Sequence, residues 1–352
     1  MSSARATGGS LEIPIIDIEG FEGGGGERRA QIAQQVDRAA RNVGFMQIRG
    51  HGVPELAADG LVEAMDGFFA LPFQDKTALR SSTPEINRGY TGSQAERLSY
   101  SLGISSPADL FEAYNVGAES SRFPGMELDE EHYPANMWPD RPALFEHNID
   151  AWMRHAGRLA TALTRIFAVS LDLPVDYFKS YTDHSVDTLR MNRYQMPADP
   201  DFRLQPGQLG MGPHTDYGVV TVLWADDVLP GLQILDSEGR WHDVRPAPGA
   251  LLINLGDLLA RWTNDRWIST MHRVLAPIDP QGRPLSRRSA AYFHDGNADA
   301  LIRCLPSCVA AGEVPLYEPV TVADHLAAKL GGSRGLRLND RAGREAARVA
   351  DG

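Results

Sequence analysis

The 352-residue sequence is poor in cysteine, contains no long apolar run and has no excess of basic residues. Its two cysteines, Cys304 and Cys308, are not accompanied by a second Cys/His pair at zinc-finger spacing, so we expect free thiols rather than a zinc site. No stretch of about 18 apolar residues predicts a membrane-spanning helix. The formal net charge of −12 disfavours binding to nucleic acid or an anionic membrane, since both require a basic surface.

The first ten residues are small and polar and lack the apolar segment of a signal peptide. Together with the free thiols, this predicts a cytoplasmic protein with a flexible tail over residues 1–10. The remaining chain has no internal repeat and no clear linker. We therefore expect a single domain over residues 11–333 and a loose tail over residues 334–352.

The N-terminal part, up to about residue 187, is expected to be rich in helices. Apolar residues recur at helical spacing over residues 27–43, 54–70 and 142–171, with Pro54 in the first turn of the second helix. Residues 81–140 are rich in Gly, Pro, Ser and Asn, which is typical of loops with one or two short strands. Such loops are a common place for substrate contacts.

From about residue 188 to 294, the periodicity changes to that of short β-strands. The expected strands cover residues 189–194, 212–223, 231–235, 241–244, 250–255, 269–275 and 288–293. Short strands at regular spacing are typical of a jelly roll. The sequence thus predicts a mainly β protein with flanking helices around a double-stranded β-helix core. A C-terminal extension to residue 333 follows, with a short helix starting at Val320.

The predicted strand after Gly212 carries His214 and Asp216. Side chains two residues apart leave the same face of a strand, so we expect these two to point together. Two histidines and one carboxylate on one face of a metal ion are typical of non-haem Fe(II) oxygenases. A second histidine is therefore needed to complete the site.

His272 is the leading candidate because it lies in a strand-like segment that a jelly roll could return to His214. Four other histidines are expected on helices or polar loops with no nearby partner, and His242 is expected to face solvent. The pattern alone leaves the choice open between His272 and the rest of the set: His51, His132, His147, His155, His184, His242, His294 and His325.

The ordered set of motifs resembles the isopenicillin N synthase-like branch of the 2-oxoglutarate/Fe(II)-dependent dioxygenases. The resemblance runs from Ile13 to about Phe293, and its motifs lie at residues 13–17, 44–48, 51–54, 214–216, 254–257, 270–274 and 287–289. It implies that His214, Asp216 and His272 hold Fe(II). It also implies that O2 and 2-oxoglutarate are co-substrates, that a small molecule is oxidised, and that succinate and CO2 are released.

Arg287 and Ser289 are two residues apart on one predicted strand and therefore face the same way. A guanidinium group matches a carboxylate in a bidentate, charge-assisted pair. The resemblance implies that this pair binds the distal carboxylate of 2-oxoglutarate and that Asn192 and Tyr194 line the same pocket. Without the resemblance, Arg287 could instead be an exposed arginine at the protein surface.

Substrate contacts are expected over the open face of the iron, from Arg88, Tyr90, Phe111, Tyr217 and Phe293. Arg88 could pair with an acidic group of the substrate, although a solvent-facing loop arginine fits the pattern equally well. For Phe293, packing in the core is an equally good alternative to substrate contact. Tyr217 is expected on the face opposite to Asp216. A carboxylate ligand at Asp216 argues against halogenation and leaves hydroxylation, desaturation and ring closure open.

Three other functions are compatible with parts of the pattern. An isopenicillin N synthase-like oxidase would use the same iron ligands without 2-oxoglutarate. A non-catalytic binding protein would have a degenerate site, and a zinc hydrolase would use the same three ligands. Release of succinate separates the oxygenase from these alternatives. We expect a monomer or weak homo-oligomer that binds neither nucleic acid nor membranes.

Overall fold

β-Strands in three groups organise the computed structural model, which describes residues 11–82, 86–197, 199–226, 231–279, 281–334, 337–339 and 343. One group consists of β1 (Ile15–Asp17), β2 (Phe45–Arg49), β3 (Gly89–Thr91), β4 (Phe111–Gly117), β5 (Thr188–Gln195), β7 (Val220–Ala225), β10 (Leu251–Leu255) and β12 (Ser286–His294). The second consists of β6 (Met211–His214), β8 (Leu232–Leu235), β9 (Trp241–Asp243) and β11 (His272–Val274). The third is the pair β13 (Leu301–Ile302) and β14 (Val320–Thr321).

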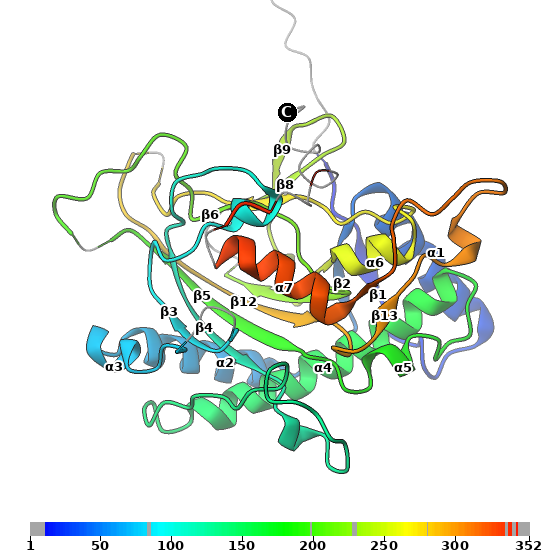
Figure 1. Ribbon diagram of the computed structural model, residues 1–352, viewed down its shortest axis with the longest axis horizontal. Helices are drawn as coiled ribbons and strands as arrows, with labels where there is room; N and C mark the ends of the chain where they lie inside the picture. The colour runs from blue at the N-terminus through cyan, green and yellow to red at the C-terminus, as the bar shows by residue number, and fades with distance from the viewer. Residues whose placement is uncertain are drawn as a thin grey trace, which may run out of the picture.

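The first two groups are the two sheets of the core. Within the described residues, the larger sheet has the order β1-β2-β10-β7-β12-β5-β4-β3 and the smaller has the order β6-β11-β8-β9 (Figure 1). Strands far apart in the sequence are therefore neighbours in space. This mainly β architecture with flanking helices confirms the fold class predicted from strand spacing.

Helices flank the two sheets, and some of them pack against the larger one. They are α1 (Gly26–Asn42), α2 (Glu55–Phe69), α3 (Phe73–Thr77), α4 (Phe145–Ser170), α5 (Lys179–Thr182), α6 (Asp257–Trp262) and α7 (Val322–Ser333), with 3₁₀ turns at η1 (Leu98–Leu102), η2 (Ser120–Arg122) and η3 (Pro306–Cys308). α4 is amphipathic and fully buries Ile149, Trp152 and Phe167. In Figure 1, α2 and α4 lie below the larger sheet, where α4 contacts the central strands β7 and β12, whereas α7 crosses in front.

The strand predicted over residues 212–223 is instead two strands in different sheets. β6 ends at His214, β7 begins at Val220, and Asp216 lies in the segment that crosses between the sheets. This crossing needs a close approach at Gly218, where an added Cβ would lie 1.9 Å from Asp295 Oδ1. Strand alternation therefore does not explain why His214 and Asp216 point together. The crossover itself brings them together.

Two flexible tails were predicted, one at each end of the chain. The tail predicted over residues 1–10 lies outside the described residues, as does most of residues 334–352. Arg334, however, is ion-paired with Glu96, with 3.2 Å between Nε and Oε1, and Asn339 donates from its main-chain N–H to Tyr100 O at 3.0 Å. These contacts join two residues of the predicted C-terminal tail to the η1 segment and its neighbour Glu96. Cys304 is a free thiol, as is Cys308.

Candidate active site

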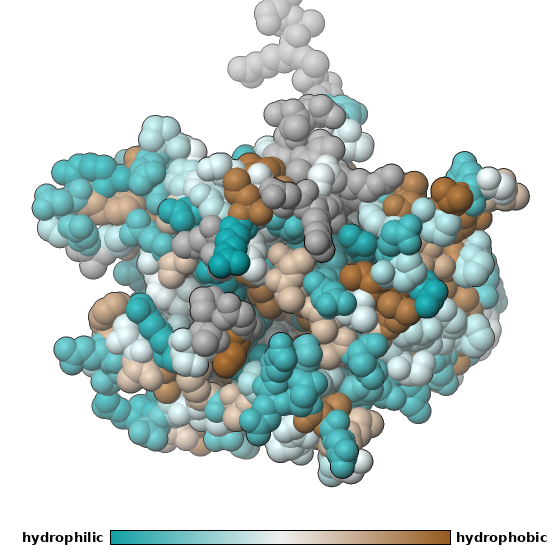
Figure 2. Space-filling view, in the orientation of Figure 1, coloured by the Kyte–Doolittle hydropathy of each residue, from teal (hydrophilic) through white to brown (hydrophobic). Residues whose placement is uncertain are grey.

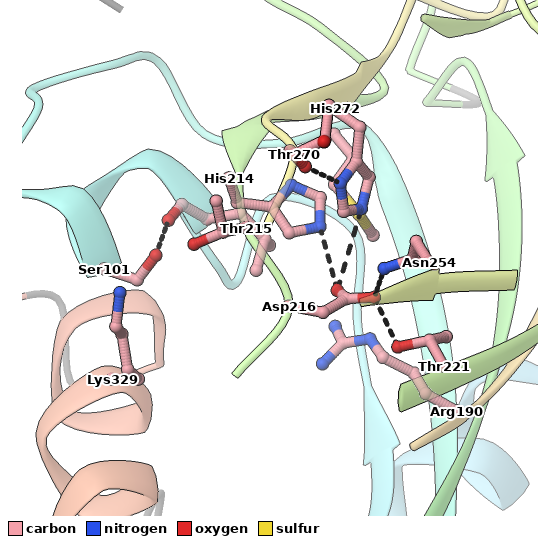
Figure 3. Close-up of polar contacts among 12 residues, drawn as sticks. Ser101, Arg190, His214, Thr215, Asp216, Thr221, Asn254, Thr270, His272 and Lys329 are labelled. Atoms are coloured by element: carbon pink, nitrogen blue, oxygen red, sulfur yellow. Dashed lines mark hydrogen bonds and ion pairs between the residues drawn. The ribbon is translucent and has the colours of Figure 1, made fainter. Parts of the chain in front are cut away.

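His214, Asp216 and His272 form one buried group of potential metal ligands. His214 and His272 are directly opposite each other on the paired strands β6 and β11, with ring centroids 4.2 Å apart. The Nε2 atoms of His214 and His272 lie 3.9 and 3.6 Å from Asp216 Oδ1 (Figure 3). One potential ligand atom from each residue lies within 4.8 Å of the others. Three side chains from one side can thus reach a common ion.

Main-chain carbonyls fix the orientation of both imidazoles. The Nδ1 of His214 lies 2.8 Å from Gly212 O, and that of His272 lies 3.1 Å from Thr270 O. Because a carbonyl oxygen only accepts, each Nδ1 must carry the proton, and each Nε2 keeps its lone pair for a metal. Burial lowers the pKa of His214 to about 3, and the neighbouring His272 adds to this effect. His214 is therefore neutral at neutral pH, as a metal ligand must be.

The Asp216 carboxylate has one occupied and one available oxygen. Its Oδ2 accepts hydrogen bonds from Thr221 Oγ1 at 2.5 Å and from Asn254 Nδ2 at 2.6 Å (Figure 3). Its Oδ1 faces the two imidazoles. The donor set of two neutral imidazoles and one carboxylate oxygen, with partners that hold all three in place, fits Fe(II).

These three residues and the predicted co-substrate residues line the same cavity, which has a volume of about 500 Å³. The pairing of β12 with β5 places Arg287 opposite Tyr194 and Ser289 opposite Asn192. All four side chains line the cavity, and Arg287 is only 5% exposed, so it is not a surface arginine.

The arginine of this group is a buried cation prepared for an anion. Its guanidinium carbon lies 5.5 Å from the centre of the Tyr194 ring, and its Nε has no hydrogen-bond partner among the described residues. Ser289 Oγ lies 3.3 Å from both Asn192 Nδ2 and the Tyr194 hydroxyl. Burial lowers the pKa of Arg287, and a bound carboxylate would offset the cost of burying this charge.

The structure separates the five predicted substrate residues into two sets. Arg88, Tyr217 and Phe293 line the cavity. Arg88 is 3% exposed and donates to the main-chain oxygens of Asn87 and Ala118, and burial lowers its pKa to about 10, so it is not a solvent-facing loop arginine.

Tyr90 and Phe111 do not line the cavity. They belong to β3 and β4, in which every residue is buried, so both faces of these strands are packed. The Tyr90 hydroxyl donates to Glu112 Oε2 at 2.7 Å, and its ring packs near Phe68. Phe111 packs against Tyr194, with the guanidinium of Arg190 4.9 Å from its ring centre.

Sequence reasoning missed Arg190 and the wall formed by α7. Arg190 lines the cavity, pairs with buried Glu96 at 2.8 Å and donates from Nε to Asn192 Oδ1 at 3.1 Å. Its position two residues before Asn192 was a signal for a shared strand face. A short helix was predicted from Val320, but its role in lining the cavity, for example through Leu330 of α7, was not.

Among the described residues, no other histidine joins the metal-ligand group. Three of those expected to lack partners do have them, and the first is His155, whose Nδ1 lies 2.5 Å from an Arg158 guanidinium nitrogen. His132 Nδ1 lies 2.7 Å from Asp129 Oδ1, and His325 is buried near Asp257. His242 is half-buried rather than solvent-facing, with its Nε2 2.6 Å from Asp236 Oδ2.

Both parts of the chain match profiles of one enzyme family. Residues 13–141 match the family described as "non-haem dioxygenase in morphine synthesis N-terminal", and residues 186–296 match the "2OG-Fe(II) oxygenase superfamily". The chain belongs to the 2-oxoglutarate/Fe(II)-dependent dioxygenases, in the isopenicillin N synthase-like branch that the sequence resembles. It is accordingly an oxidoreductase that uses iron, O2 and 2-oxoglutarate to oxidise a small molecule, with release of succinate and CO2.

Individual relatives support this assignment over most of their length. The 2-oxoglutarate-Fe(II) type oxidoreductase hxnY of Emericella nidulans is 36% identical over 88% of this chain and 87% of that protein. Validamycin A dioxygenase of Streptomyces hygroscopicus subsp. limoneus is 34% identical over 85% of this chain and 81% of that protein.

A solved structure supports the fold directly. Neurospora crassa T7H in complex with alpha-KG and 5-formyluracil has 30% identity and a TM-score of 0.78, covering 94% of this chain and 99% of that chain. This similarity confirms the predicted double-stranded β-helix core. No helix among the described residues is both long and apolar enough to span a membrane.

Proposed function

We propose that His214, Asp216 and His272 hold Fe(II) in this oxygenase, and that Arg287 and Ser289 hold the distal carboxylate of 2-oxoglutarate. The observation that carries this proposal is one cavity lined by both groups. Bound iron would supply activation of O2 coupled to oxidative decarboxylation of 2-oxoglutarate. The chain contributes orientation, charge complementarity and exclusion of water.

The protein groups in this proposal have separate tasks. Gly212 O and Thr270 O hold the imidazoles with Nε2 inward, and Thr221 and Asn254 hold Asp216 with Oδ1 inward. Arg287 and Ser289 would position the co-substrate from the opposite end, supported by Tyr194 and Asn192. The apolar side chains Leu232 and Val274 also line the cavity and reduce the access of water.

The substrate would occupy the part of the same cavity that is lined by Arg88, Tyr217 and Phe293. A cavity of about 500 Å³ suits a small molecule rather than a macromolecule. Relatives act on different compounds, since one is named for validamycin A and another for homoarginine. We therefore propose a compact polar substrate without assigning an individual compound.

The remaining proposals concern the whole protein. The net charge of −12 supports an enzyme that does not bind nucleic acid. On the face drawn in Figure 2, hydrophobic residues form small groups among hydrophilic ones, which supports a monomer or weak homo-oligomer. Two free thiols are compatible with the cytoplasm. The main buried hydrophobic cluster includes residues from β1 to α7, which supports a single domain over residues 11–333.

Succinate formation by the Fe(II)-loaded protein tests the proposed function. The reaction is run with 2-oxoglutarate and O2, with and without a panel of small polar metabolites, for the wild type and Arg287→Met. We expect succinate formation that depends on iron and is stimulated by at least one metabolite, and a strongly raised 2-oxoglutarate requirement in the variant. Substrate-dependent O2 uptake without succinate would instead indicate the oxidase reaction. Activity with Zn(II) alone would indicate a hydrolase.

A further inference from the structure

The C-terminal helix α7 carries a stripe of buried polar side chains, formed by His325, Lys329 and Ser333. These residues are four apart and therefore share one face of the helix. They are 5%, 3% and 1% exposed, respectively. Lysine is almost never fully buried unless it is paired, so this face must contact complementary groups.

The contacts of the stripe lie in and beside the segment that carries Asp216. Lys329 Nζ is 2.8 Å from Asp257 Oδ2 and 5.9 Å from the centre of the Tyr217 ring. The imidazole of His325 faces the main chain of Tyr217, and the Tyr217 hydroxyl faces Ser333. Figure 3 shows Lys329 reaching from the helix towards this segment.

Asp257, the first residue of α6, continues these contacts to a proposed metal ligand. The Oδ2 atom that meets Lys329 also accepts a hydrogen bond from Thr215 Oγ1 at 3.0 Å. The main-chain N–H of Asp257 donates to Asp216 O at 2.8 Å. The Asp257 carboxylate thus contacts Thr215, and the main chain of the same residue contacts Asp216.

A second face of α7 forms part of the cavity wall through Ala323, Leu326 and Leu330. The same short helix therefore both closes the cavity and contacts the metal-ligand segment. Removing the Lys329 charge would leave Asp257 as a buried carboxylate without its cation, which is strongly unfavourable. The segment over residues 215–218 would then shift to give this carboxylate another donor or water.

We propose that Lys329 is a positioning residue that acts through Asp257 to hold Asp216 in its metal-binding position. Docking of α7 over the cavity and assembly of the metal-ligand group are then coupled. This inference rests on the proposed role of His214, Asp216 and His272 as ligands. It concerns metal affinity, and so it can be measured without turnover.

Anaerobic Fe(II) binding to the full-length metal-free protein tests the inference. We compare the wild type, Lys329→Met, Asp257→Asn and the double variant, with Ala328→Gln as a control at an exposed position of the same helix. Lys329→Met is expected to weaken Fe(II) binding at least fivefold in the wild-type background but less than twofold in the Asp257→Asn background. The control should bind like the wild type. Equal losses in both backgrounds, or none in the wild-type background, would overturn the inference.

Two further measurements separate positioning from a general loss of stability. Lys329→Gln keeps one hydrogen-bond donor and serves as the milder variant, with a smaller loss of Fe(II) affinity expected in the same direction. Hydrogen exchange of the metal-free Lys329→Gln protein should increase at residues 215–218 together with α7. Faster exchange in α7 alone would contradict the coupling. If the wild-type protein itself binds no Fe(II), the proposed function fails. If the wild type binds Fe(II) and the Lys329 variants bind it with the same affinity, only the positioning role fails.

Discussion

Thr221 and Asn254 are direct cross-strand partners on β7 and β10, and both donate to the same oxygen of Asp216. The larger sheet therefore holds a carboxylate that belongs to neither strand. The smaller sheet holds the two histidines as cross-strand partners on β6 and β11. The strand register of both sheets thus determines where the ligands of the proposed metal centre lie.

Removal of the Asn254 amide should weaken metal binding without unfolding the protein. Asn254→Leu leaves Asp216 Oδ2 with one donor, so the carboxylate can rotate and Oδ1 is no longer fixed. Loss of such an outer partner typically lowers metal affinity about 10–100-fold. Fe(II) titration of the metal-free variant measures this change. Asn42→Leu, at an exposed amide at the end of α1, is the control, and equal affinity of both variants would exclude the role of Asn254.

Arg287→Met should raise the KM for 2-oxoglutarate strongly while the protein still binds Fe(II). A buried carboxylate would lose its charged partner, at a cost of about 2–5 kcal/mol. Initial rates of succinate formation over a range of 2-oxoglutarate concentrations give the KM of each protein. Arg283→Gln is the matched control because the Arg283 side chain is 76% exposed. An unchanged KM in Arg287→Met would place the anion elsewhere.

The stability of the fold should depend on Trp152, which is fully buried in α4. Trp152→Ala removes a large side chain from the core between helix and sheet, and we expect a loss of about 3–5 kcal/mol in the free energy of unfolding. Leu56→Ala, at a side chain that is 81% exposed in α2, should change it by no more than about 0.5 kcal/mol. Urea denaturation followed by circular dichroism measures both, and similar losses would contradict the packing described.

Buried His325 should make the fold less stable in acid. Burial lowers its pKa to about 3, so the unfolded chain takes up this proton at a higher pH than the folded protein does. Its contribution to stability is complete above about pH 6.5 and is lost as the pH falls below that value, by at most about 1.4 kcal/mol per pH unit. Urea denaturation between about pH 7 and pH 5 should show a weaker pH dependence for His325→Gln than for the wild type. His147→Gln, at an exposed position, should leave the pH dependence unchanged.

The sequence predicted most helices and strands because their periodicity is local. Strand alternation correctly placed Arg287 and Ser289 on one face, and the motif resemblance pointed to His272. The sequence could not show that the strand through His214 ends before Asp216, because this break depends on contacts with β7, α6 and Asp295. The sequence also could not show that Tyr90 and Phe111 lie outside the cavity lining, because a strand pattern shows that a side chain is buried, not whether it faces a cavity or the core.

Anaerobic Fe(II) binding by the metal-free wild type and by His214→Ala, Asp216→Ala and His272→Ala tests whether these three residues hold the iron. We expect one Fe(II) per chain in the wild type and at least a tenfold loss of affinity in each folded variant. We also expect no succinate formation by the variants. Wild-type affinity retained in any one of the three would contradict the claim that these side chains hold the metal together.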